Sequence, residues 1–269
     1  MGADIKSLRN RIKSVRSTAQ LTNAMGLVAS SKIRRAQEAR VKSGQYKDAL
    51  CSIVDVLTLS EECKKSFYIT PPKGSNKTKI ILIAGDRGLA GGYNANIFRF
   101  VKEMGDVDVF PIGKKACERY KSEIISSERF TNQDALLLAK TLCEEFKSAE
   151  YEKIGIVYTK YVSMIAQEPS VEWILPLTSS GKETKNAGAV FEPSEIAILE
   201  SSVPIYVAGL IYETTREAFA CEVVARRNAM DSAGKNAKTM IDSLQLQYNR
   251  ARQGAITQEI TEIVAGSGE

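Results

Sequence analysis

All seven prolines of this 269-residue chain lie between Pro71 and Pro204, so the long stretches at both ends contain none. Proline removes a backbone donor and clashes with the preceding helical turn, so its absence allows each end to form one uninterrupted helix. The pattern predicts a helix from Asp4, its N-cap, to about residue 60, and a second helix from Ile205 to about Ala265. A helical pattern already begins near Glu195, and we expect Pro204 to kink it.

Both predicted helices carry small or apolar residues at spacings of three and four, the pattern of a coiled-coil seam. The series extends from Ile5 to Ala36 in the first helix and from Met230 to Ala255 in the second. We therefore expect the two helices to pair in an antiparallel coiled coil. Its seam residues include Ile12, Val15, Ile241, Leu244 and Tyr248.

The segment between the two helices has a different pattern, in which short β-type apolar runs alternate with helical stretches. The predicted strands are Lys79–Gly85, Val107–Ile112, Lys153–Thr159 and Val171–Leu177, the last bounded by Pro169 and Pro176. Helices are expected at 94–104, at 114–121 and from Asp134 onward, with a linker at 70–76 and a loop at 178–189. Such alternation predicts an α/β domain with a mainly parallel sheet. The expected organisation is a terminal helix at 1–65, an α/β domain at 77–190 and a terminal helix at 205–269.

The composition argues against an enzyme or a metal protein. Histidine is absent, which removes the commonest general base and metal ligand. The five cysteines include no C-x-x-C pair, so neither a zinc site nor a redox pair is indicated. We expect no catalytic residue, no metal and no cofactor. The longest apolar runs are about five residues, against roughly 20 for a membrane helix, so no membrane-spanning helix is expected.

The net charge of +5 is unevenly distributed along the chain. Met1–Lys47 contains eleven Lys and Arg residues against two acidic ones, which gives this stretch a charge of +9. Such a surface fits a solvated helix face, or contact with nucleic acid, anionic lipid or an acidic protein loop. Tyr46 is the only aromatic residue of the stretch, which argues against single-stranded nucleic acid because that binding uses stacked aromatic side chains.

Two segments could carry a specific function. The loop Gly85–Asn94 joins a strand to a helix and contains four glycines, a setting in which backbone N–H groups can bind phosphate. It lacks the G-K-[ST] ending of a P-loop and the spacing of a dinucleotide fingerprint, so a tight structural turn is the other interpretation. Near the C-terminus, Arg252 and Gln253 point away from the seam at 100° per residue. This polar group fits a solvated face or a contact with a second protein.

Three motifs in the same order resemble those of the gamma subunits of F-type ATP synthases, and the resemblance covers nearly the whole chain. They are the opening helix Ile5–Met25 with Val28–Lys32, the loop Gly85–Asn94, and the C-terminal segments Met230–Ala237 and Ala251–Val264. The resemblance implies an antiparallel coiled coil with an inserted Rossmann-like α/β domain. It also implies a rotor with no active site of its own, which couples ion flow to ATP synthesis.

The same resemblance implies partners and contact residues. The partners would be an alpha3beta3 hexamer, an epsilon subunit and a membrane ring of c subunits, with one copy of this chain per complex and no nucleic acid. The chain would be peripheral to the cytoplasmic face of a bacterial membrane. The residues that would contact beta subunits are Arg252, Gln253, Thr257, Glu259, Met25 and Lys32.

Two other functions remain open from the residues alone: a nucleotide-binding α/β enzyme that uses the Gly85–Asn94 loop, and a basic coiled-coil adaptor on nucleic acid. The residues do not distinguish a proton from a sodium ion as the coupling ion.

Overall fold

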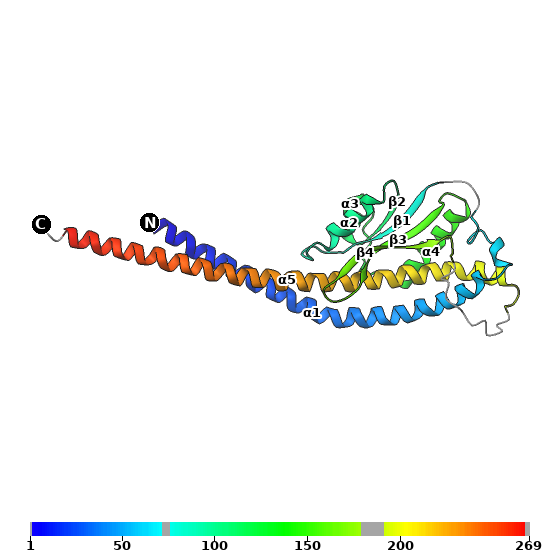
Figure 1. Cartoon of the computed structure of the whole chain (residues 1–269), viewed down its shortest axis with the longest axis horizontal. Coiled ribbons are helices and arrows are strands. Elements are labelled where there is room, and N and C mark those ends of the chain that lie inside the picture. Colours follow the sequence, from blue (N-terminus) through cyan, green and yellow to red (C-terminus); the bar gives the residue numbers. More distant parts are fainter. Residues whose placement is uncertain (1, 72–75, 179–190, 267–269) are drawn as a thin grey trace. The chain divides into compact units, whose positions relative to one another are not determined.

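The computed structural model describes residues 2–71, 76–178 and 191–266 (Figure 1). Backbone contacts divide the chain into two compact units. Met1–Ser30 and Arg226–Glu269 form one, here called the helical unit, and Ser31–Ala225 forms the other, the α/β unit. Two long helices contribute to both units: α1, Gly2–Thr58, and α5, Glu195–Gly266.

In the helical unit, α1 and α5 lie close together and antiparallel. A Cβ atom added at Gly26 would meet the Cβ of Met230 at 3.6 Å, and one added at Gly234 would lie 3.1 Å from the side-chain oxygen of Asn23. Residue numbers therefore rise along one helix as they fall along the other. A Cβ at Gly26 would make ordinary contact with Met230, and one at Gly234 would require the Asn23 side chain to shift by a few tenths of an ångström.

The α/β unit contains a four-stranded sheet in the order β2-β1-β3-β4. Its strands are β1 (Thr78–Ile83), β2 (Asp108–Ile112), β3 (Lys153–Tyr161) and β4 (Gln167–Leu175). β1 pairs in parallel with both β2 and β3, whereas β4 pairs antiparallel with β3. The edge strands β2 and β4 each include a proline, Pro111 and Pro169 respectively.

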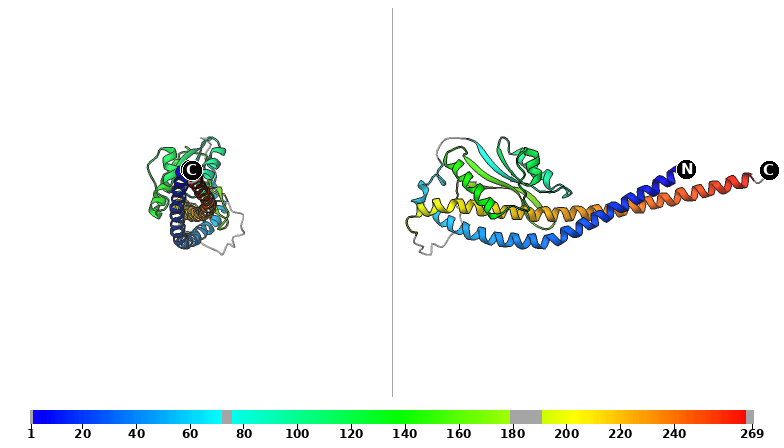
Figure 2. Two further views of the ribbon diagram at one scale, coloured as in Figure 1. Left: turned by 90° about the vertical axis from the view of Figure 1, so that its left-hand side faces the viewer. Right: turned by 180° about the vertical axis from the view of Figure 1, so that it is seen from behind.

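Alternate residues of the inner strands pack on opposite faces of the sheet. Ile81 and Ile83 of β1 belong to a core with α4 (Asn132–Lys147), the part of α5 near Leu199 and the end of α1. Ile80 and Leu82 belong to a second core with the two helices α2 (Tyr93–Glu103) and α3 (Lys114–Tyr120). Figures 1 and 2 show α1 and α5 alongside each other below the sheet in this unit. We call the segment between α1 and α5 that carries the sheet the insert.

A close approach between the ends of β1 and β2 shapes the edge where the loops emerge. Ala84 donates its N–H to the carbonyl of Ile112 at 2.9 Å. The next residue, Gly113, has a φ of +98°, and a Cβ there would lie 2.0 Å from the carbonyl oxygen of Ala84. Only glycine fits both conditions, so the loops after β1 and β2 are held side by side.

Several boundaries differ from those expected. α1 begins at Gly2, so Asp4 lies in the first turn, where its charge suits the helix dipole, and does not serve as the N-cap. α5 begins at Glu195 and continues through Pro204, because Val203 and Val207 on either side of the proline are buried in the sheet core. α4 begins at Asn132, with Thr131 as the N-cap in a capping box with Asp134. Parts of the expected linker at 70–76 and loop at 178–189 lie outside the described residues.

One stretch of α5 is apolar and long enough to cross a membrane, with a mean hydropathy of 1.4 over 18 residues. The core helix of a soluble protein meets the same criterion. In this stretch of α5, Leu199, Val203, Val207 and Ile211 are buried in the sheet core, whereas Ile205 is 45% exposed. Packing within the α/β unit therefore accounts for part of the apolar composition.

Candidate functional site

The expected seam residues lie in the helical unit, on the sides of α1 and α5 that are shielded from solvent. Ile12 and Leu244 are buried, and Val15, Ile241 and Tyr248 are half-buried. Their neighbours along each helix are mostly exposed. Apolar side chains at this spacing stabilise a helix pair by removing one stripe of each helix from water.

The polar group near the C-terminus lies on exposed helix surface. Arg252, Gln253, Thr257 and Glu259 are all exposed, and Thr257 donates its hydroxyl to the carbonyl of Gln253 at 2.9 Å. Within the described residues, the side chains of Arg252, Gln253 and Glu259 form no hydrogen bond or ion pair. Their donors and acceptors are thus free to meet another molecule. Met25, also in the helical unit, is half-buried.

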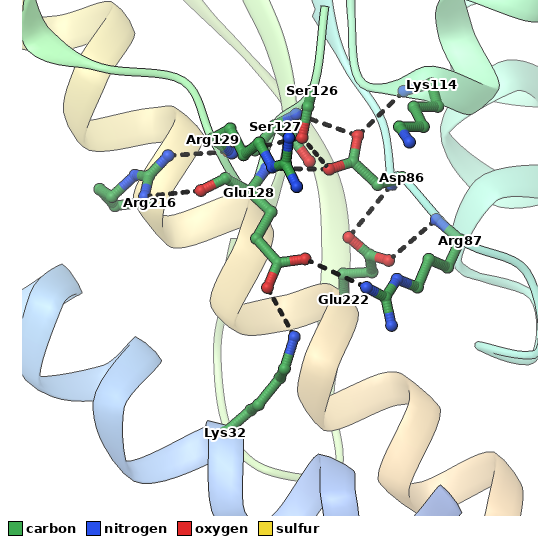
Figure 3. A network of polar contacts seen from close by, with 10 residues as sticks. All are labelled: Lys32, Asp86, Arg87, Lys114, Ser126, Ser127, Glu128, Arg129, Arg216 and Glu222. Carbon is green, nitrogen blue, oxygen red and sulfur yellow. Dashed lines mark hydrogen bonds and ion pairs between the residues drawn. The ribbon is translucent and has the colours of Figure 1, made fainter.

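Lys32 differs from the other expected contact residues because it has a partner within the chain. It belongs to the α/β unit, and its Nζ lies 2.5 Å from Oε1 of Glu128 in the loop before α4. The other carboxylate oxygen of Glu128 lies 3.7 Å from the Arg87 guanidinium. Glu128 thereby connects α1 to the loop that follows β1 (Figure 3).

The glycine-rich loop after β1 already holds an anion, and that anion is Glu222 of α5. The backbone N–H groups of Asp86 and Arg87 donate to the two carboxylate oxygens of Glu222, each at 3.3 Å. Asn94 accepts the N–H of Gly85 at 2.9 Å. A Cβ at Gly85 would lie 2.9 Å from the carboxyl carbon of Glu222, so glycine is needed to let this side chain approach. The N–H groups that bind phosphate in nucleotide-binding loops here bind the chain's own carboxylate.

Asp86 fills the second position at which a ligand could bind. Its carboxylate accepts the backbone N–H groups of Lys114, Ser127 and Glu128, each at 3.0 Å, and the Ser126 hydroxyl at 2.6 Å. Burial alone would raise the pKa of Asp86, but these four hydrogen bonds outweigh it and lower the pKa below its ordinary value. Asp86 therefore stays ionised and fixes the loop before α4 to the end of β1.

Arg216 of α5 holds the same loop from the other side. Its guanidinium donates to the carbonyls of Ser127 at 2.7 Å, Phe130 at 2.9 Å and Glu128 at 3.4 Å. Figure 3 shows Arg216 and Asp86 on opposite sides of this loop, with Lys32 reaching Glu128 from α1.

A cleft of 730 Å³ opens beside this network. Its lining includes Asp86, Arg87, Lys114, Glu128 and Arg129. The carboxylates that face it are engaged by the hydrogen bonds and ion pairs described above, so none of them is available as a general base. The cleft therefore has a polar lining whose carboxylates already have partners within the chain.

A half-buried lysine joins the two long helices and the sheet. Nζ of Lys47 on α1 lies 2.8 Å from Glu172 of β4 and 3.4 Å from Glu213 of α5. Burial lowers the pKa of Lys47, but the two carboxylates more than reverse this and raise it. Burial raises the pKa of Glu213 to about 6, against the opposing effect of Lys47. These three side chains hold the edge of the sheet against both helices.

The sequence patterns indicated the glycine-rich loop Gly85–Asn94 but did not indicate that the Glu222 carboxylate binds to it. Glu222 lies in the otherwise apolar run Ala218–Ala225, and an acidic residue in such a setting was the one signal of a buried, hydrogen-bonded carboxylate. Among the described residues, no group of three or more His, Cys, Asp or Glu side chains is arranged to hold a metal ion. All five cysteines are free thiols.

Comparison with known proteins gives one consistent result. The family model described as ATP synthase matches residues 4–268. The ATP synthase gamma chain of Ruminococcus albus is 38% identical over 282 residues, with 98% of each chain covered. The ATP synthase gamma chain, sodium ion specific, of Acetobacterium woodii is 36% identical and covers 99% of each chain.

A solved structure has the same fold. A chain of the Euglena gracilis mitochondrial ATP synthase, from the OSCP/F1/c-ring structure in rotational state 3, is similar with a TM-score of 0.67 at 17% identity. The similarity covers 99% of this chain and 94% of that one. Because the family model and the bacterial relatives both extend over almost the entire sequence, this chain belongs to the gamma chains of ATP synthase.

Proposed function

We infer that this chain is the central-stalk rotor subunit of an F-type ATP synthase. The observation that carries the inference is the match to ATP synthase gamma chains over nearly the full length. The architecture agrees with it, since α1 and α5 form an antiparallel pair and the insert packs on the same two helices. A rotor subunit transmits torque between its partners. This role requires partner-binding surfaces and stiff contacts within the chain, and it does not require a reactive centre.

The proposed partners are the alpha3beta3 hexamer, the epsilon subunit and the c-ring, with one copy of the chain per complex. The paired helices would turn inside the hexamer, and the insert would attach to the ring and to epsilon. The chain would thereby be peripheral to the cytoplasmic face of a bacterial membrane. Rotation of one asymmetric shaft would bring the three catalytic sites of the hexamer to different affinities in turn.

The exposed polar group on α5 is the proposed contact with a beta subunit. Arg252 can donate two parallel hydrogen bonds to a carboxylate, and Gln253, Thr257 and Glu259 can add neutral or acceptor contacts. Their exposure and the free side chains of Arg252, Gln253 and Glu259 support this role. Met25 stays a predicted contact. Lys32 does too, although its charge is shared with Glu128 within the chain.

Nothing in the site favours a nucleotide-binding enzyme. The N–H groups of Asp86 and Arg87, which a phosphate would need, are hydrogen-bonded to Glu222. A phosphate at this loop would have to displace a carboxylate that is only 1% exposed. Burying a carboxylate without hydrogen bonds is unfavourable, so the loss of these two donors to Glu222 would oppose the displacement.

Reconstitution tests the proposed function. The chain would be produced with and without the alpha and beta subunits of the same synthase, and ATP hydrolysis measured for each preparation. We expect the isolated chain to hydrolyse no ATP and the three-subunit complex to hydrolyse it through the hexamer. In vesicles that contain the complete synthase, a proton gradient and a sodium gradient applied separately would identify the coupling ion.

Two outcomes would contradict the proposal. ATP turnover by the isolated chain that is lost on Arg87→Ala would favour an enzyme. Failure to join the hexamer, combined with DNA binding whose affinity falls steeply with salt, would favour an adaptor on nucleic acid.

A further inference from the structure

α5 is held in the α/β unit by two kinds of contact that follow one another along the helix. Between Leu199 and Ile211 the contacts are apolar: Leu199, Val203, Val207 and Ile211 are fully buried in the sheet core. In the next three turns apolar contacts continue at Ala218 and Cys221, and hydrogen bonds to the insert are added to them. Apolar burial is non-directional, so the first part gives adhesion without fixing the angle of the helix about its own axis.

Three side chains of α5 in this stretch form hydrogen bonds with backbone atoms of the insert. Arg216 donates to the carbonyls of Ser127, Glu128 and Phe130. Glu217, 7% exposed, accepts the N–H of Tyr161 at 2.8 Å. Glu222 accepts the N–H groups of Asp86 and Arg87. Backbone partners cannot follow a moving helix by changing rotamer, so these bonds are stiff.

The three anchors leave the helix in different directions. A helix turns by about 100° per residue. Arg216 and Glu217 are therefore about 100° apart around the axis, Glu217 and Glu222 about 140°, and Glu222 and Arg216 about 120°. Anchors spread in this way resist rotation of the helix in either sense, because any turn lengthens at least one set of bonds.

Further contacts fasten the loops that receive these anchors. Tyr93, at the start of α2, donates its hydroxyl to the carbonyl of Ala218 at 2.8 Å. Glu128, whose carbonyl accepts from Arg216, also pairs with Lys32 of α1. Asp86, whose N–H donates to Glu222, holds the backbone of Ser127 and Glu128. The contact points of Arg216 and Glu222 therefore belong to one connected network (Figure 3), whereas Glu217 binds the end of β3 separately.

We propose that Arg216, Glu217 and Glu222 are positioning residues that lock the rotational setting of α5 in the insert, so that torque applied to the insert passes to the long helices. The proposal rests on the proposed rotor function. The apolar contacts of α5 supply adhesion, and the three charged anchors supply torsional stiffness. Without the three anchors, α5 turns about its own axis against the apolar sheet core when the rotor works against a load. Rotation without a load is unaffected.

The experiment compares loaded with unloaded rotation in the purified complete synthase. The variants are Arg216→Gln, Glu222→Gln and the double variant, with Arg216→Lys as the conservative replacement. The control is Glu145→Gln, which removes the partner of Lys79 in a 2.7 Å ion pair that lies wholly within the insert. The unloaded measurement is ATP hydrolysis by the detached soluble complex. The loaded measurement is the number of ions pumped into vesicles per ATP hydrolysed.

We expect unchanged hydrolysis per complex and a severalfold lower ion-to-ATP ratio in the double variant, smaller losses in the single variants, and recovery with Arg216→Lys. Glu145→Gln should keep the ratio of the parent. An unchanged ratio in the double variant would overturn the proposal, as would a parallel fall of hydrolysis and pumping. If the double variant does not assemble, the ion-to-ATP ratio of Glu222→Gln tests the proposal in its place. Failure of the parent chain to support any coupled pumping would instead refute the rotor function itself.

Discussion

Replacing Glu222 with alanine should create a binding site for a small carboxylate at the end of β1. The change deletes a CH2–COO⁻ group, the equivalent of acetate, and leaves the N–H groups of Asp86 and Arg87 without their acceptor. Hydrogen bonds to a charged acceptor contribute about 1.5–3 kcal/mol each. Because both N–O distances are 3.3 Å, at the long end of the range, we expect a total loss of about 2–4 kcal/mol.

Urea unfolding of the purified chain measures the loss and its rescue. Acetate would be titrated against chloride at constant ionic strength, and the free energy of unfolding followed for parent and variant. A ligand that binds only the folded state adds about 1.4 kcal/mol at ten times its dissociation constant, so acetate should recover a large part of the loss. Glu222→Gln is the matched control, because its amide keeps the volume and leaves no room for acetate.

Two results would refute this account of the loop. One is a loss of less than about 0.5 kcal/mol in Glu222→Ala, the range of ordinary surface substitutions. The other is stabilisation by acetate that is equal in the alanine variant, the glutamine variant and the parent, because that would be a general salt effect.

Three further predictions concern other parts of the chain. Leu244→Asp should destabilise the helical unit by several kcal/mol, because Leu244 is 4% exposed and a buried unpaired charge is unfavourable. The control is Leu246→Asp, at a residue that is 53% exposed, which should leave the thermal unfolding of the chain nearly unchanged. Burial raises the pKa of Glu213 from 4.5 to about 6, so its stabilising contribution is complete below pH 4.5 and is lost as the pH rises through 6. The stability of Glu213→Gln relative to the parent, measured by urea unfolding, should therefore rise by about 1–2 kcal/mol as the pH increases from 5 to 7. A stability difference that stays constant over this range would contradict the raised pKa. Replacing both Arg252 and Gln253 with alanine should reduce ion-driven ATP synthesis in vesicles and leave the melting temperature of the chain unchanged. Removal of the residues beyond Val264 should reduce ATP synthesis less. A larger loss of ATP synthesis in the truncated chain than in the alanine variant would exclude this pair as the beta-subunit contact.

Much of the fold could be predicted because its signals are local. The run Ile80–Ala84 is apolar throughout, as a strand covered on both faces requires, and most of it lies in the buried strand β1. The prediction of two long helices around an α/β insert with a mainly parallel sheet is confirmed. Proline was less informative than expected at single positions. Pro204 lies inside α5 and Pro169 inside β4, since tertiary packing and an edge position respectively accommodate the missing donor.

The candidate site was less predictable because its contacts join residues far apart in sequence. Glycines marked the loop after β1, yet the group that fills it is Glu222, 136 residues away. Local pattern cannot choose between a phosphate and a distant carboxylate, because both satisfy the same N–H groups. The assignments of Arg252, Gln253, Thr257 and Glu259 to a partner surface stay predictions for a similar reason, because the molecule they would meet is another chain.

The two edge prolines bear on how the protein avoids self-association. An exposed edge strand presents unpaired N–H and C=O groups to which another chain can add a strand, the first step of many aggregates. Pro111 in β2 and Pro169 in β4 each remove one such donor, while the inner strands β1 and β3 contain no proline. Both borders of the sheet are thus poor templates for a further strand. The two edge prolines thus help to keep the sheet at four strands.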